Sequence, residues 1–355
     1  MSNRLNKFRK LMQEKHIGTY LVVCPENRRY LSGFTGSSAY LLITPEKAWL
    51  LTDFRYIEQA KAEAPEFEIV RHSPKWEETL QQLLKGEGSK ELAFEQDFIT
   101  YNQYLRLSEH LSGLKLEPEQ GIMSSLRMVK DEAELELLRQ AVKIADEGFD
   151  RILNYITPGL TEVQVAVELE FCLRRLGAER AAFDFIVAAG EHSALPHATP
   201  GNRELKQGEQ VKMDYGGVVQ GYHSDITRTV FLGQASDRFR EIYYTVLEAQ
   251  EKALAAIAPG KNGREIDAIA RDFIASRGFG EFFGHGLGHG VGLEIHEQPT
   301  LSTQGETILQ PGMVVTVEPG IYLPDWGGVR IEDMVVVTAS GCEILTKAPK
   351  ALIEL

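Results

Sequence analysis

Two short strings in this chain repeat each other, and each string ends on a carboxylate. Every member of the first string has a counterpart 104 residues later: Leu205, Gly208, Val211 and Asp214 match Leu309, Gly312, Val315 and Glu318. A second carboxylate follows each string, at Asp225 and at Glu332. Carboxylates gathered in one site repel one another unless a cation lies between them or one is protonated. The duplication therefore predicts a four-carboxylate site that holds a pair of divalent cations between two related halves of the chain.

Imidazole groups accompany these carboxylates in a glycine-rich segment between the two strings. His285, His289 and His296 fall within twelve residues, and glycine occupies every second position from 284 to 292. A helix would cost about 1 kcal/mol per glycine there, so we expect extended backbone packed closely against a ligand or another segment. Imidazole favours Zn²⁺, Co²⁺, Fe²⁺ or Mn²⁺, whereas oxygen ligands also suit Mg²⁺ and Ca²⁺. Neither His-Glu-x-x-His nor Gly-x-Gly-x-x-Gly occurs in this segment.

A further histidine, His197, lies in Leu195-Pro196-His197. At the offset that relates the two halves it falls beside His296, so we expect the two side chains to face the site from opposite sides. The alternative is a loop histidine whose only role is a hydrogen bond.

The first string is expected to belong to a strand hairpin. Residues 211–215 and 222–229 read as strands, with glycines between them. A loop centred on Val219-Gln220 would place Asp214 directly opposite Asp225, with Cβ atoms about 4.5–5.5 Å apart.

The elements around the carboxylates are duplicated as well. Each half reads as helix, Pro-Gly, helix, Gly and strand hairpin, and the punctuating residues recur 101 residues apart: Pro158-Gly159 with Pro259-Gly260, and Gly177 with Gly278. Two copies of such a unit suggest one domain of pseudo-equivalent halves, with sheets inside and helices outside. We expect this α+β domain to span residues 123–355.

Residues 1–122 show a different pattern, in which extended and helical stretches alternate. Strands are predicted at residues 21–23, 40–43 and 49–52, and helices at residues 55–64 and 76–84. A linker is expected at 117–121, which contains Pro118 and Gly121. No cluster of histidines, cysteines and carboxylates occurs in this region, so we expect an α/β domain with its own core and no metal site.

Composition narrows the possible partners and location. The chain has 355 residues and a net charge of −13, which disfavours nucleic acid and anionic membranes because both select basic patches. We expect no signal peptide and no membrane-spanning segment, because the first residues are not followed by an apolar run and no stretch of about 18 apolar residues occurs in the sequence. The three cysteines, Cys24, Cys172 and Cys342, are odd in number and far apart. This usage favours the reducing cytoplasm.

At these residues the chain resembles the aminopeptidase P and prolidase family, the Xaa-Pro metallopeptidases with the pita-bread fold. The resemblance covers nearly the whole chain and implies a creatinase-like N-terminal domain followed by a pita-bread catalytic domain. The matching motifs are Met213-Asp214-Tyr215-Gly216, the segments 221–229 and 285–297 with Pro299, Val317-Glu318-Pro319-Gly320-Ile321-Tyr322, and Gly328-Val329-Arg330-Ile331-Glu332-Asp333.

The resemblance also implies a set of roles at the site. It implies two divalent ions, commonly Mn²⁺ or Co²⁺ with Zn²⁺ as an alternative, and the ligands Asp214, Asp225, His289, Glu318 and Glu332. Asp225 and Glu332 would bridge the ions, and Glu318 would also transfer a proton. Substrate contacts fall on His197, His285, His296 and Arg330. His197 and His296 are placed to donate to the oxyanion or the leaving group. A homodimer is implied in the same way.

The activity expected from this resemblance is hydrolysis of the Xaa-Pro bond, in dipeptides or in longer peptides with proline second. X-Pro is a tertiary amide without an N–H, so a dedicated site must fit the ring. One alternative is a methionine-aminopeptidase-like activity. Methionine aminopeptidases share the pattern of five ligands, but they lack the large N-terminal domain present here. A metal-free amidinohydrolase of the creatinase type is excluded if the carboxylates bind metal. A non-catalytic peptide-binding scaffold would have no activity for a chelator to remove.

Overall fold

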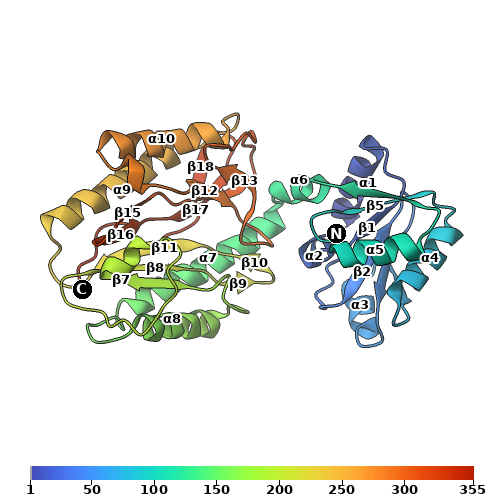
Figure 1. Cartoon of the computed structure of the whole chain (residues 1–355), viewed down its shortest axis with the longest axis horizontal. Coiled ribbons are helices and arrows are strands. Elements are labelled where there is room, and N and C mark those ends of the chain that lie inside the picture. Colours follow the sequence, from blue (N-terminus) through green and yellow to red (C-terminus); the bar gives the residue numbers. More distant parts are fainter. Residues whose placement is uncertain (1) are drawn as a thin grey trace. The chain divides into compact units, whose positions relative to one another are not determined.

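The structure is a computed structural model that describes residues 2–355, and the chain divides into two compact units, 1–127 and 128–355 (Figure 1). The domain limit proposed from the sequence, after residue 122, lies at the start of helix α6 (Ile122–Met128). Among the described residues, none of the helices is both long and apolar enough to cross a membrane.

The first unit is built on a six-stranded mixed sheet with the strand order β4-β3-β2-β1-β5-β6. The predicted strands and helices of this unit are present, with small shifts at their ends. Its elements are α1 (Ser2–Glu14), β1 (Tyr20–Val22), α2 (Pro25–Ser32), β2 (Ala39–Ile43), β3 (Ala48–Thr52), α3 (Ile57–Glu63), β4 (Glu68–Arg71), α4 (Trp76–Gly86), β5 (Glu91–Glu95), α5 (Tyr101–His110) and β6 (Lys115–Glu119).

The linker predicted at residues 117–121 is wrong for its first three residues. They belong to β6, which pairs in parallel with β5, and Phe94 lies opposite Pro118. Every N–H of a central strand is needed by one of its two neighbouring strands, and proline has none to donate. Strand β6 lies at the edge of the sheet, where proline is tolerated. Proline and glutamate therefore marked the edge of a sheet here, not a break between domains.

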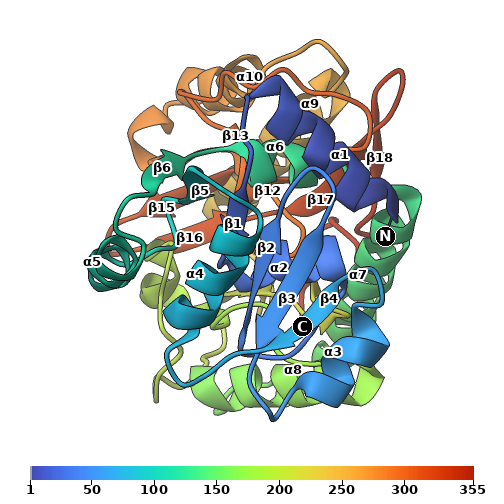
Figure 2. The ribbon, with the colours of Figure 1, turned by 90° about the vertical axis from the view of Figure 1, so that its right-hand side faces the viewer.

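The second unit repeats a pattern of two helices followed by strands. In Figures 1 and 2 the strands lie between the helix pair of one half and the helix pair of the other. The first half contains α7 (Glu132–Ile152), α8 (Glu162–Leu176), β7 (Ile186–Ala189), the 3₁₀ helix η1 (Gly190–Ala194), β8 (Gln210–Tyr215), β9 (Val218–Val219), β10 (Tyr222–His223) and β11 (Ile226–Phe231). The second contains α9 (Asp237–Ala256), α10 (Gly263–Ser276), η2 (Gly280–Phe282), β12 (Gly288–Gly290), β13 (Glu297–Leu301), β14 (Val314–Val317), β15 (Gly320–Leu323), β16 (Gly327–Arg330), β17 (Asp333–Val337) and β18 (Cys342–Ile344).

Local sequence signals explain where these helices begin. Asp131, Thr161 and Asn262 each cap a helix, and each forms a capping box with the residue three positions later. Helix α8 ends at Gly177, whose positive φ of 112° is one that glycine adopts readily. Helix α10 likewise ends at Ser276, shortly before Gly278, so the helix pair predicted from the repeat is present in both halves.

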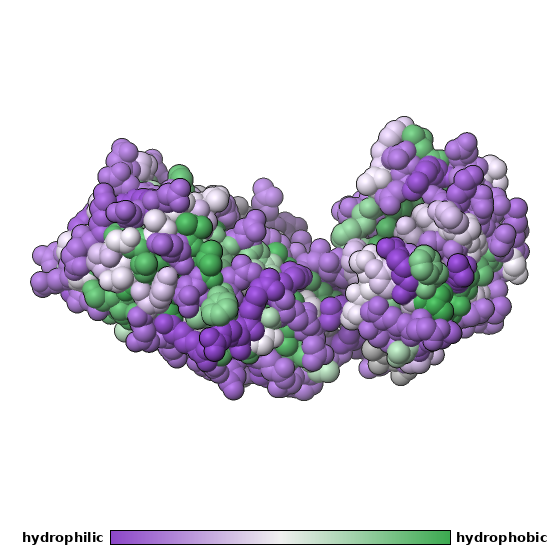
Figure 3. Space-filling model, turned by 90° about the horizontal axis from the view of Figure 1, so that it is seen from below, coloured by the Kyte–Doolittle hydropathy of each residue, from purple (hydrophilic) through white to green (hydrophobic). Residues whose placement is uncertain are grey.

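Each half of the second unit has its own hydrophobic core. In the first, Phe149 and Leu169 of the helices pack in one cluster with Met213 of β8. In the second, Val246 of α9 lies in a cluster with Val315 of β14. On the face of the molecule in Figure 3, hydrophilic residues predominate and hydrophobic residues occur in separate small groups. The apolar side chains thus hold each sheet against its helices and leave the polar strand ends available for a site.

The register of the first hairpin differs from the prediction. Asp214 pairs with Thr227, not with Asp225. The turn is formed by Gln220 and Gly221, which both have positive φ, 44° and 79°, as a type I′ turn requires. The hairpin centre therefore lies one residue later than expected, and every pairing across the ladder shifts by two residues.

Arg228 of β11 ties the two halves together in the buried interior. Its guanidinium donates to Asp333 Oδ1 at 2.8 Å and to the carbonyl oxygen of Ala348 at 2.8 Å. The other oxygen of Asp333 accepts from Gln250 at 2.8 Å and from Lys350 at 2.7 Å. Since Asp333 follows Glu332 directly, this network holds the start of β17 in place.

Replacing Arg228 by methionine should destabilise the protein by roughly 3–5 kcal/mol, because it leaves the buried Asp333 carboxylate short of a partner. Chemical denaturation followed by circular dichroism would measure the loss. The exposed pair Arg238–Glu241 provides the matched control, since Arg238→Met should cost no more than about 1 kcal/mol. Equal costs for the two variants would contradict the structural role of Arg228.

Candidate metal centre

A cavity of about 660 Å³ in the second unit is lined by every residue that the sequence predicted for the site. Strands and the segments at their ends supply these residues from both halves of the unit. The first half contributes His197, Asp214 and Asp225, and the second contributes His285, His289, His296, Glu318, Arg330 and Glu332. Residues up to 135 positions apart in the sequence are thus brought to one cavity by the duplicated topology.

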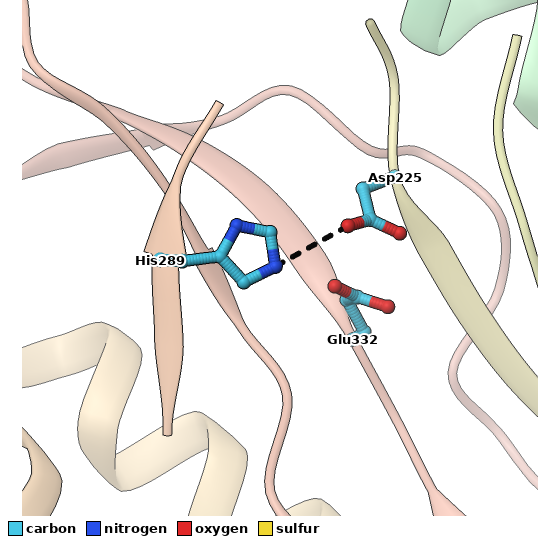
Figure 4. Close-up of side chains that lie close together, drawn as sticks. All are labelled: Asp225, His289 and Glu332. Atoms are coloured by element: carbon cyan, nitrogen blue, oxygen red, sulfur yellow. Dashed lines mark ion pairs between the residues drawn. The ribbon is translucent and has the colours of Figure 1, made fainter. Parts of the chain in front are cut away.

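Three of these side chains converge most closely. Asp225, His289 and Glu332 each offer a ligand atom, and these atoms all lie within 4.8 Å of one another (Figure 4). His289 Nε2 lies 3.5 Å from Asp225 Oδ2 and 3.4 Å from Glu318 Oε1. One imidazole nitrogen therefore faces two carboxylates that come from different halves of the unit.

The orientation of His289 follows from its hydrogen bonds. Nδ1 lies 3.1 Å from the carbonyl oxygen of Gly290, which can only accept, so Nδ1 carries the proton. Burial lowers the pKa of His289 to about 4, with a further contribution from His296. The ring is thus neutral at pH 7, and the lone pair of Nε2 points toward the carboxylates, as a metal-ligating histidine requires.

Thr316 supports the same side of the cluster. Its Oγ1 accepts from the backbone N–H of His289 at 3.0 Å and donates to Glu318 Oε1 at 3.3 Å. Close backbone packing makes this contact possible, since a Cβ at Gly288 would lie 2.0 Å from the carbonyl oxygen of Thr316. The expectation of extended, closely packed backbone is met at Gly288.

Arg330 and Thr227 organise the other side. Arg330 Nη2 donates to Asp214 Oδ2, and Arg330 Nε donates to Thr227 Oγ1 at 3.0 Å. Thr227 in turn donates to Glu332 Oε2 at 2.7 Å. Asp214 Oδ1 and Glu332 Oε1 are buried and have no hydrogen-bond partner among the described residues. Each of these two carboxylates therefore keeps one oxygen available for another ligand.

The electrostatics of the cluster show what that ligand must be. Burial raises the pKa of Asp225 and of Glu332 well above the usual range, and the neighbouring carboxylates raise both further. Burial also raises the pKa of Glu318 to about 8, with Asp214 adding to the shift against the opposing charge of Arg330. A divalent cation between these groups would replace repulsion by attraction. Oxygen donors with one imidazole suit such an ion, so the residues fit a metal.

His285, Tyr322 and Arg330 form a directed chain of hydrogen bonds. Arg330 Nη1 donates to Tyr322 Oη at 2.7 Å, and Tyr322 Oη lies 2.9 Å from His285 Nε2. Because His285 Nδ1 faces the carbonyl oxygen of Gly286 at 2.8 Å, Nε2 must accept from the tyrosine. Burial, and then Arg330, lower the pKa of His285 to about 4. His285 is therefore a neutral imidazole held by its neighbours.

His197 and His296 lie at the same cavity from opposite halves, as predicted. The ring of His296 packs against that of His289, with centroids 4.4 Å apart. Burial and then the nearby His197 lower the pKa of His296. His197 is exposed on the loop after η1. The His296 ring is thus close to both of these imidazoles, and it is inclined by 68° to the ring of His289.

Sequence reasoning assigned no role to Thr227, Thr316 or Tyr322. Thr227 and Thr316 each lie two residues from a predicted ligand, Asp225 and Glu318, and residues at that spacing face the same side of a strand. This two-residue spacing could have indicated that both threonines lie beside the predicted ligands. Tyr322 follows Glu318 at an even spacing too, but only the fold shows that it contacts His285.

Comparison with known proteins agrees with this geometry. Residues 136–339 match the sequence pattern of Metallopeptidase family M24, and residues 4–129 match the Creatinase/Prolidase N-terminal domain. An uncharacterized peptidase of Bacillus subtilis is 46% identical over 352 residues, which cover 99% of this chain and 100% of that protein.

Two solved structures are similar over their whole length. The Xaa-Pro dipeptidase from Bacillus anthracis has a TM-score of 0.97 and 44% identity, covering 100% of this chain and 99% of that one. The X-Pro aminopeptidase from Thermotoga maritima has a TM-score of 0.92 and 38% identity, again covering 100% and 99%. The predicted fold, a creatinase-like N-terminal domain with a pita-bread catalytic domain, is confirmed. The chain belongs to the M24 family of metallopeptidases.

Proposed function

We propose that this protein hydrolyses the peptide bond before proline and releases the N-terminal residue from Xaa-Pro dipeptides or from peptides with proline second. The observation that carries this proposal is the buried cluster of Asp225, His289 and Glu332 in a cavity that also holds Asp214 and Glu318. The family supplies the reaction class, peptide hydrolysis by a metal. The similar structures described as an Xaa-Pro dipeptidase and an X-Pro aminopeptidase support the substrate.

The proposed cofactor is a pair of divalent ions, with Mn²⁺ favoured and Co²⁺ or Zn²⁺ as alternatives. Asp225 and Glu332 would contribute to both positions, Asp214 to one, and His289 with Glu318 to the other. The contacts support this division, since His289 Nε2 faces Asp225 and Glu318, whereas Asp214 faces Arg330. Bound divalent ions activate water at neutral pH and polarise a carbonyl oxygen.

The chain's own residues would then orient the substrate and move protons. Glu318, whose Oε1 accepts a hydrogen bond from Thr316, is placed to take a proton and return it to the leaving nitrogen. His296 and His197 would donate to the oxyanion or to the leaving group. His285 and Arg330, which are linked through Tyr322, would also contact the substrate.

The leaving group distinguishes the two forms of this activity. Cleavage of Ala-Pro but not of an Ala-Pro-Xaa tripeptide would define a dipeptidase, and cleavage of both would define an aminopeptidase. The match of residues 4–129 to the Creatinase/Prolidase N-terminal domain weighs against a methionine-aminopeptidase-like activity. The imidazoles of His285 and His289, which hydrogen bonds hold in one orientation, weigh against a non-catalytic scaffold, which needs no such arrangement.

We also propose that the protein is a homodimer, as the family resemblance implies, and that it is located in the cytoplasm. The thiols of Cys24, Cys172 and Cys342 are all free, and burial raises the pKa of each. Thiols with raised pKa values react slowly and suit a reducing compartment. The net charge of −13 supports a peptide substrate over nucleic acid or a membrane surface as partner.

Replacing Asp225 by asparagine should remove most of the bound metal and abolish hydrolysis of Ala-Pro, because the amide keeps the shape but loses the charge. Loss of a residue that only hydrogen-bonds to a metal ligand typically lowers activity by up to roughly 100-fold. Loss of a direct ligand should lower the activity by more than this. Elemental analysis and a ninhydrin assay for released proline would measure both. Asp184→Asn, which alters a carboxylate of the cavity wall outside the cluster, should keep its metal. Turnover at the wild-type rate by the Asp225 variant would contradict the metal assignment.

Replacing His296 by alanine should lower kcat for Ala-Pro about 10²–10³-fold, as expected for loss of a donor to the oxyanion. The metal content should stay at the wild-type level because His296 is proposed to contact substrate only. His289→Ala is the matched control, since it removes the neighbouring imidazole and should release metal. Purifying the His296 variant without metal would overturn this division of roles.

A further inference from the structure

The loop that carries His197 is irregular, so its backbone carbonyl groups need donors from elsewhere in the fold. After η1 the chain runs to residue 201 without regular secondary structure. His197 is exposed, and its side chain makes no hydrogen bond within the part of the chain that the structure describes. The position of this imidazole therefore depends on how the backbone beside it is held.

Lys212 of β8 supplies the donors. Its Nζ lies 3.0 Å from the carbonyl oxygen of Ser193 and 2.7 Å from that of Leu195, with a longer contact of 3.5 Å to Pro196. The side chain is fully buried. A lysine is almost never fully buried unless it is paired, yet among residues 2–355 Lys212 makes no ion pair. Its hydrogen bonds all go to the segment that leads directly into His197.

Other contacts show that Lys212 holds a distinct part of this loop. The buried Glu162 of α8 accepts from the backbone N–H groups of Ala189 at 2.9 Å and Gly201 at 3.2 Å, at the two ends of the loop. Arg330 Nη1 donates to the carbonyl oxygen of Pro196 at 3.2 Å. The residue before His197 is therefore bound from two directions, by the strand of Asp214 through Lys212 and by Arg330.

We infer that Lys212 is a positioning residue for catalysis, which fixes His197 relative to Asp214 by binding the carbonyl groups of Ser193, Leu195 and Pro196. The role rests on the proposed function, in which His197 contacts the reacting group. Lys212 does not line the cavity and would touch neither substrate nor metal. Without the Lys212 side-chain nitrogen, the carbonyl groups of Ser193 and Leu195 would lose this donor and the backbone before His197 would become more mobile, although Arg330 would still bind Pro196.

The test is a double-mutant cycle between Lys212→Met and His197→Ala, with Mn²⁺ and Ala-Pro. Lys212→Met should lower kcat on the order of 10²-fold, the scale expected when a catalytic group moves by about 1 Å, with metal content unchanged. In the His197→Ala background the same change should lower kcat by no more than about 2-fold, because the positioned group is already absent. Hydrogen exchange should become faster in residues 193–197.

Lys130→Met is the matched control, since the Lys130 side chain is only 1% exposed but its Nζ binds Glu297 at 3.2 Å instead of this loop. Lys130→Met should lower kcat by the same factor in the wild-type and the His197→Ala backgrounds, because the two sites are independent.

Three results would each overturn the inference: an equal loss of kcat from Lys212→Met in both backgrounds, unchanged hydrogen exchange in residues 193–197, or loss of metal from the Lys212 variant. If Lys212→Met does not fold, Lys212→Gln serves in the same cycle. If the wild-type protein cleaves neither Ala-Pro nor an Ala-Pro-Xaa tripeptide, the proposed function fails, and hydrogen exchange alone then tests the role of Lys212.

Discussion

Mutual repulsion among buried carboxylates is the constraint on which the rest of this structure depends. Asp214, Asp225, Glu318 and Glu332 line one cavity, and burial makes their negative charges more costly than they would be in water. A fold that gathers such groups needs rigid positions for them and a compensating positive charge. The buried Arg330 supplies part of that charge by its contact with Asp214. Divalent ions would supply the rest.

The duplicated architecture provides the rigid positions. Each half packs its own core against its own pair of helices, so the strand ends that meet at the cavity are held independently. The network of Arg228, Asp333 and Lys350 then joins the halves just behind Glu332. Around the site, Thr227 and Thr316 each bind one carboxylate oxygen, which orients the group while other oxygens stay available.

Much of this arrangement follows from local sequence rules. The recurring Pro-Gly pairs and single glycines predicted the helices of both halves, and the carboxylate strings with the histidine segment predicted residues around the cavity. The pairing of Asp214 did not follow, because a one-residue choice of turn decides the register and only the positive φ angles of Gln220 and Gly221 reveal it. Contacts such as Tyr322 with His285, and Lys212 with Ser193, join segments whose spacing in the sequence carries no signal.

Anomalous diffraction from crystals grown with Mn²⁺ would test the central claim, that the four carboxylates and His289 hold two ions. The account predicts two peaks about 3.5–4 Å apart, one beside Asp214 and the other beside His289 and Glu318, with Asp225 and Glu332 in contact with both. A single fully occupied peak, or metal bound elsewhere in the cavity, would contradict it.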